Sequence, residues 1–116
     1  MKIAGDLKNV TETKVIAAAH ANEDILWDFK DGFESVRKAR RLEGMLYGSR
    51  VYGNQTAAIE LKASSEDAIK AINLEYRMTR YLIDEINNLV GGNIVDMRGS
   101  DRAVCLRFYN TYRNVI

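Results

Sequence analysis

Proline is missing from this chain, and cysteine, histidine and tryptophan each occur once. With Cys105 as the only cysteine, an intramolecular disulfide and a cysteine-based zinc site are both excluded. The apolar neighbours of Cys105, at 103, 104 and 106, predict that it is an inert thiol in the core. His20 is the only histidine, so one chain cannot supply a pair of histidine ligands to a metal.

Long hydrophobic runs are also missing. The longest uninterrupted apolar run covers residues 15–19, whereas a membrane-spanning helix needs about 20 residues. The first residues lack the basic stretch, apolar segment and small-residue cleavage site of a secretory signal. We therefore expect a small soluble protein in the cytoplasm, with no membrane contact.

Composition and charge indicate one globular domain, residues 1–116. The chain is 47% hydrophobic and 28% charged, and its net charge is +1. That charge is unevenly placed, because acids outnumber bases in residues 1–36 and bases outnumber acids in residues 37–116. Two explanations stay open: an anion-binding surface in the second part, or ordinary helix electrostatics.

A helical stripe of apolar residues predicts one long helix over residues 12–41. Thr11 is the expected N-cap, and the basic cluster at 37–41 is expected at the C-terminal end, where the helix dipole favours cations. A competing interpretation makes residues 13–19 a strand and starts the helix after Asn22. The alanines at 17–19 and 21 argue against that strand.

Alternating apolar and polar residues predict two hairpins. Residues 56–62 alternate with the period of a strand, and their expected partner is 49–52. The second predicted hairpin joins 93–98 to 102–110 through a turn at 99–101, with Val104, Leu106 and Phe108 on one face.

A second helix is predicted over residues 66–90, between a capping box at Ser64 and a glycine stop at Gly91. The resulting order is αββαββ. We therefore predict an α+β fold in which two long helices pack on one face of a mostly antiparallel sheet.

The apolar positions of the second helix cover an arc of roughly 240°, whereas a surface helix needs little more than about 100°. Such a helix must be covered on two sides, by the sheet and by either the first helix or a second subunit. Glu75 stands within this arc. It is predicted to form a buried ion pair with an arginine such as Arg40 or Arg41, and a functional carboxylate is the alternative.

Trp27 lies opposite the apolar stripe of the first helix, among charged residues. An exposed tryptophan is typical of an interface, although packing against the chain's own hairpin or tail is the alternative. Asp24, Asp28 and Asp31 have the spacing to gather a hard cation, but acids near the start of a helix are more typical of a solvated face. We therefore predict no metal and no cofactor.

The outward face of the predicted sheet combines arginine with tyrosine, a composition that suits a protein contact or a single-stranded nucleic acid. The partner-binding candidates are Trp27, Tyr52, Tyr109 and Tyr112, and the nucleic-acid candidates are Arg50, Lys62, Arg107 and Arg113.

The sequence contains no recognised nucleophile motif, such as a Gly-x-Ser-x-Gly elbow. We therefore expect a non-enzymatic binding or assembly module, either homo-oligomeric or docked on a larger protein partner. The alternative is a protein that binds single-stranded nucleic acid. A third hypothesis is a small enzyme centred on His20 or Glu75.

Overall fold

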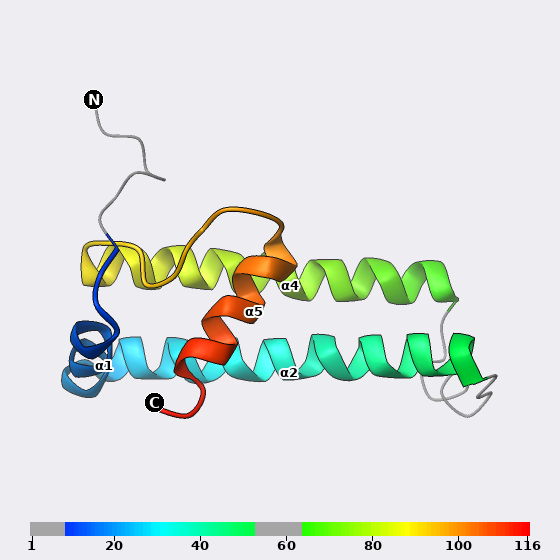
Figure 1. Cartoon of the computed structure of the whole chain (residues 1–116), viewed down its shortest axis with the longest axis horizontal. Helices are drawn as coiled ribbons and strands as arrows, with labels where there is room; N and C mark the ends of the chain where they lie inside the picture. Colours follow the sequence, from blue (N-terminus) through cyan, green and yellow to red (C-terminus); the bar gives the residue numbers. More distant parts are fainter. Residues whose placement is uncertain (1–8, 53–63) are drawn as a thin grey trace.

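Four helices make up the architecture of the described part of the chain (Figure 1). The computed structural model describes residues 9–52 and 64–116, and it describes the side chains of the second helix as far as Tyr47. The helices are α1 (Glu12–Ala21), α2 (Glu23–Tyr52), α4 (Ser65–Val90) and α5 (Asp101–Tyr112). Within these residues there is no strand, only an isolated bridge between Asn9 and Asn93. The predicted α+β fold is therefore wrong, and the described chain is all-helical.

The predicted helix over residues 12–41 is divided at Asn22. Thr11 caps α1 as predicted, because its hydroxyl accepts a hydrogen bond from the Lys14 backbone N–H at 3.4 Å. Asn22 is extended, with φ −132°, and its side-chain oxygen accepts from the backbone N–H of Asp24 at 3.0 Å. The side chain of Asn22 therefore caps a new helix, as Ser, Asp and Asn commonly do. The competing interpretation was right about this start, but its strand at 13–19 is helical.

Helix α2 continues well beyond the predicted end at residue 41. It includes residues 49–52, so the predicted strand there is wrong. The predicted partner strand, 56–62, lies outside the described residues. The basic cluster at 37–41 stands in the middle of α2, and the dipole at a helix end cannot explain it, since that effect falls off within the last turn.

Helix α4 agrees with its prediction at both ends. The Ser64 hydroxyl accepts a hydrogen bond from the Asp67 backbone N–H at 3.1 Å. Gly91 ends the helix with φ +78°, a left-handed conformation that glycine adopts without a steric penalty.

The second predicted hairpin is a loop followed by α5. Ser100 does not sit in a hairpin turn but caps α5, accepting from the Ala103 backbone N–H at 3.1 Å. The buried residues of α5 then follow helical spacing, not the alternation that suggested a strand. They are Val104, Cys105, Phe108, Tyr109 and Tyr112.

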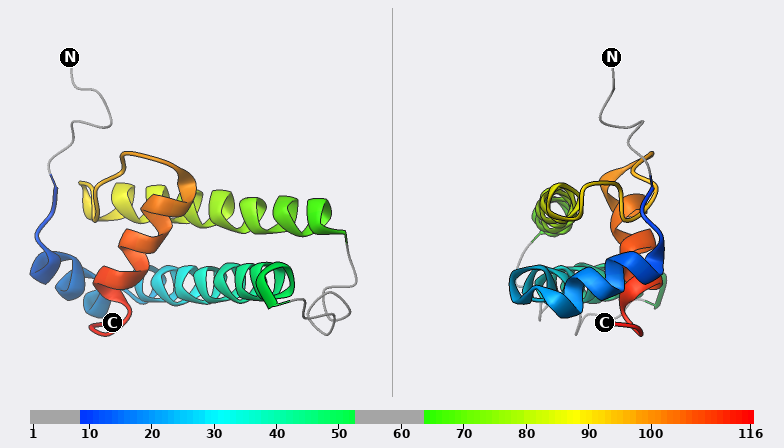
Figure 2. Two further views of the ribbon diagram at one scale, coloured as in Figure 1. Left: turned by 45° about the vertical axis from the view of Figure 1, so that its right-hand side comes forward. Right: turned by 90° about the vertical axis from the view of Figure 1, so that its left-hand side faces the viewer.

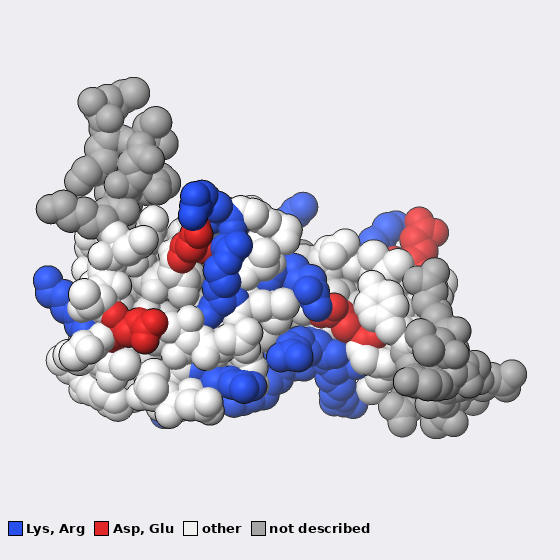
Figure 3. Space-filling view, in the orientation of Figure 1, with Lys and Arg blue, Asp and Glu red and all other residues white. Residues whose placement is uncertain are grey.

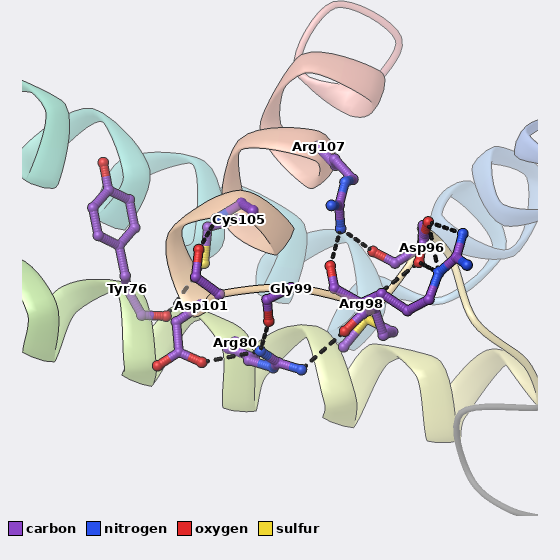
Figure 4. Close-up of polar contacts among 11 residues, drawn as sticks. Tyr76, Arg80, Asp96, Arg98, Gly99, Asp101, Cys105 and Arg107 are labelled. Atoms are coloured by element: carbon purple, nitrogen blue, oxygen red, sulfur yellow. Dashed lines mark hydrogen bonds and ion pairs between the residues drawn. The ribbon is translucent and has the colours of Figure 1, made fainter.

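Two arginines hold the loop between α4 and α5 through its carbonyl groups (Figure 4). Arg80 donates to the carbonyls of Met97 and Gly99, at 2.9 and 3.0 Å, and to the carboxylate of Asp101 at 3.1 Å. Arg107 donates to the carbonyls of Asp96 and Arg98. A guanidinium has five N–H donors, so one arginine can donate hydrogen bonds to several loop carbonyls, which the strands of the predicted hairpin would have paired with backbone N–H groups.

The core lies on one side of the antiparallel pair formed by α2 and α4. Helix α5 crosses this pair on one side, and the right-hand view of Figure 2 shows no described element on the other. Phe108 of α5 stacks on Phe29 and Phe33 of α2, with ring centroids 5.4 and 5.2 Å apart. Tyr112 packs edge-on against Phe29 at 5.1 Å. None of the helices within residues 9–52 and 64–116 is long and apolar enough to cross a membrane.

Candidate interaction surface

One face of the α2–α4 pair carries exposed apolar side chains. On α4, Leu74, Met78, Tyr81 and Leu89 are between 51% and 65% exposed. On α2, Trp27 is 55% exposed. These five residues define what we call the open face.

The geometry of the helices places these side chains opposite α5. Residues two apart on an α-helix point about 200° from each other. In α4, Tyr76, Arg80 and Ile83 face the core or α5, and each comes two residues after a member of the open face. The open-face members that they follow are Leu74, Met78 and Tyr81.

Trp27 also points away from α5. It comes two residues before Phe29 on α2, and Phe29 stacks on Phe108 of α5. Its indole N–H donates to Glu23 at 3.4 Å, and the Lys30 ammonium lies 5.3 Å from its ring centroid. The predicted exposure of Trp27 is confirmed. These exposed contacts leave more than half of the side chain accessible.

Charge is unevenly distributed along the open face. Around the first turns of α2 and the last turns of α4, acids predominate. Partial burial, and then the carboxylates of Glu85, Asp31 and Asp24, raise the pKa of Asp28 above its ordinary value. The opposite end carries charge of both signs, because Lys38 pairs with Glu75 at 2.9 Å and Lys70 pairs with Glu66 at 3.8 Å.

The acids at 24, 28 and 31 do not build a metal site. Within the described residues, no group of three or more histidine, cysteine or acidic side chains could hold a metal ion. The raised pKa of Asp28 instead reflects a partly buried carboxyl that lies close to other carboxylates.

Two of the predicted partner-binding tyrosines belong to the core. Tyr112 is fully buried, and its hydroxyl donates to the Ile94 carbonyl at 2.6 Å. Tyr109 is only 7% exposed, and its hydroxyl accepts from Arg37 Nε at 3.2 Å. The outward sheet face on which Tyr109 was expected to stand, and which Tyr112 was expected to extend from the tail, is wrong, because α5 buries one side in a helical pattern.

Two of the predicted nucleic-acid residues, Arg107 and Arg113, have described side chains, and each contacts a different part of the protein. The guanidinium of Arg107 donates hydrogen bonds to the loop carbonyls. The guanidinium carbon of Arg113 lies over the Tyr109 ring, 5.1 Å from its centroid. The side chains of Arg50 and Tyr52 lie beyond the described part of α2, and Lys62 falls outside the described residues.

Glu75 forms an ion pair, but with a different partner and less burial than expected. Its carboxylate lies 2.9 Å from Lys38 Nζ, and its side chain is 21% exposed, with that of Lys38 at 65%. The more buried carboxylate is Glu43, which binds Arg102 at 3.0 Å and accepts from the Tyr76 hydroxyl. Sequence reasoning missed Glu43 because residues after 41 were assigned to a loop and a strand.

Comparisons with protein-family models, with curated proteins and with solved structures find no match.

The described residues offer no assembled catalytic group. His20 is exposed in the last turn of α1, and no hydrogen bond or ion pair of the described residues joins it to Glu75. A hollow of about 420 Å³ is lined in part by Arg107, and one of about 280 Å³ in part by Arg102. Both arginines already bind protein groups. Burial raises the pKa of the Cys105 thiol to about 12, so its thiolate is suppressed at neutral pH.

Proposed function

We propose that this protein is a non-enzymatic assembly module in which two copies associate through their open faces. The observation that carries the proposal is the row of exposed apolar side chains on α4, opposite the side that α5 covers. Large exposed apolar groups gathered on one face are typical of protein interfaces, whereas single scattered ones need no explanation.

The charge distribution favours an antiparallel arrangement of the two copies. In a two-fold dimer the same surface meets itself, and an antiparallel arrangement places the acidic ends of the two open faces at opposite ends of the interface. A parallel arrangement would instead place like charges together.

The area of the face is adequate for a stable dimer. Helix α4 has 26 residues, so it is about 39 Å long. Two adjacent helices are together about 20 Å wide, which gives a face of roughly 800 Å². Standard protein interfaces bury about 800 Å² on each partner.

Light scattering on the parent protein over a range of concentrations tests the proposal. At tens of micromolar protein we expect a mass of twice 13.2 kDa, decreasing on dilution. A mass of 13.2 kDa at every concentration would eliminate the dimer.

Asp28→Asn should stabilise the monomer. In the monomer it relieves the repulsion from Glu85, Asp31 and Asp24, so we expect a gain of about 0.5 kcal/mol in the free energy of unfolding at pH 7. The raised pKa means that folding favours the protonated carboxyl. The gain should therefore disappear as the pH falls through that raised pKa toward 3.8, where the parent becomes protonated as well.

Urea unfolding at low protein concentration measures this effect. A loss of monomer stability at pH 7 would show that Asp28 is not crowded by like charge.

A further inference from the structure

A second surface, independent of the open face, is strongly basic. Figure 3 shows lysine and arginine gathered along the edge of α2 beside α5. The cluster consists of Arg37, Arg40 and Arg41 in the middle of α2, together with Arg113 directly after α5. We call these four residues the arginine edge.

Tyr109 contacts both Arg37 of α2 and Arg113, which follows α5. The guanidinium carbons of Arg37 and Arg113 lie 5.7 and 5.1 Å from the Tyr109 ring centroid, and Arg37 also donates to the Tyr109 hydroxyl. Burial raises the pKa of Tyr109, but the hydrogen bonds from Arg113 and Arg37 outweigh it and leave that pKa lowered. The ring therefore holds two positive charges close together on one surface.

Little negative charge within the described residues offsets the arginine edge. Arg37 forms an ion pair with Glu34, but both side chains are at least half exposed, and such pairs contribute at most about 1 kcal/mol. The nearby carboxylate of Glu43 is already bound to Arg102. No ion pair of the described chain involves Arg40, Arg41 or Arg113.

We propose that the arginine edge binds the phosphate backbone of a nucleic acid strand without reading its sequence. The planar guanidinium fork matches the geometry of phosphate oxygens, and a row of four on an open edge suits a chain of phosphates better than a single anion. Tyr109 is too buried to stack on a base, so the arginine edge would contact the strand through its phosphates, which carry no sequence information.

The exposed side chains of this stretch favour nucleic acid over an anionic membrane. A helix that lies on a membrane inserts large apolar side chains into the lipid. Between Asp31 and Gly44, α2 exposes no large hydrophobic side chain.

Fluorescence anisotropy of a labelled single strand of about 20 nucleotides tests the proposal. Four phosphate contacts give a slope of about −2.8 in log affinity against log salt, so the affinity should fall roughly 50-fold between about 50 and 200 mM salt. In the double variant Arg40→Gln with Arg41→Gln, the loss over the same range should shrink to about sevenfold, with weaker binding at low salt.

The matched control removes two positive charges elsewhere, by Lys14→Gln on α1 and Arg98→Gln in the loop before α5, which are both exposed. It should bind like the parent, apart from a small effect of net charge. Equal weakening by the control and the edge variant, or no binding by the parent at low salt, would overturn the proposal. Binding to vesicles of anionic lipid but not to the oligonucleotide would overturn it as well.

Discussion

The substitution Met78→Glu should convert the dimer into a monomer of 13.2 kDa. Met78 is 58% exposed near the middle of α4, so it would face the second copy close to the two-fold axis. In the dimer, the change buries two new carboxylates near each other, and an unpaired buried charge costs several kcal/mol. The dimer should therefore weaken at least about 100-fold, as light scattering or sedimentation would show.

Ile69→Glu is the matched control for this change. Ile69 is also an exposed apolar residue of α4, but it comes five residues before Leu74, about 140° around the helix from the open face. The control should keep the mass of the parent, and both variants should keep their helix content, because glutamate is a good helix former. Loss of assembly in both variants would show that net charge, not the open face, controls association.

Gly32→Ala should destabilise the fold by about 1 to 3 kcal/mol, the usual range for overpacking a core. Gly32 lies where α2 meets α5, and a Cβ placed on it would lie 2.8 and 2.9 Å from two carbons of the Phe108 ring. That ring is wedged between Phe29 and Phe33, so it cannot move without disturbing both stacks. Helix propensity alone predicts the opposite sign, a gain of about 1 kcal/mol.

Gly44→Ala is the control on the same helix. A Cβ at Gly44 meets nothing within 4 Å, so this change should raise the free energy of unfolding by about 0.5 to 1 kcal/mol through helix propensity. Urea denaturation of the two variants and the parent measures both effects. The same sign of change at the two glycines would show that Phe108 does not pack closely on Gly32.

Local signals in the sequence were sufficient for α4 and for the start of α1. Ser64, Gly91 and Thr11 act through hydrogen bonds or backbone conformation within a few residues, so a short stretch of sequence contains the whole cause. Asn22 is of the same kind. Its cap, with acids following it, could have been predicted, but the unbroken apolar stripe concealed it.

Helix α5 was mistaken for a strand because both periods fit the same residues. Val104, Leu106 and Phe108 alternate as in a strand, yet Leu106 is only half-buried, and the fully helical set includes Cys105 and Tyr112. Valine, phenylalanine and tyrosine favour strands, and here tertiary packing overrides that preference. The alternative signal was the cap at Ser100 followed by Asp101.

The open face could be predicted only in part. The wide apolar arc of α4 correctly indicated more apolar surface than one neighbour covers, and the position of Trp27 off its stripe indicated exposure. Which part of the arc remains open depends on where α5 crosses. That crossing follows from long-range stacking of Phe108 on α2, which no local pattern contains.

The fluorescence of Trp27 during dilution tests the central claim, association through the open face, most directly. Trp27 is the only tryptophan, and in a single copy it is 55% exposed. We predict that its emission lies at shorter wavelength, and that acrylamide quenches it less, at concentrations where the mass is twice 13.2 kDa, and that both effects vanish on dilution to the monomer. Equal quenching of Trp27 in the dimer and the monomer would contradict the account, because the copies would then associate through another surface.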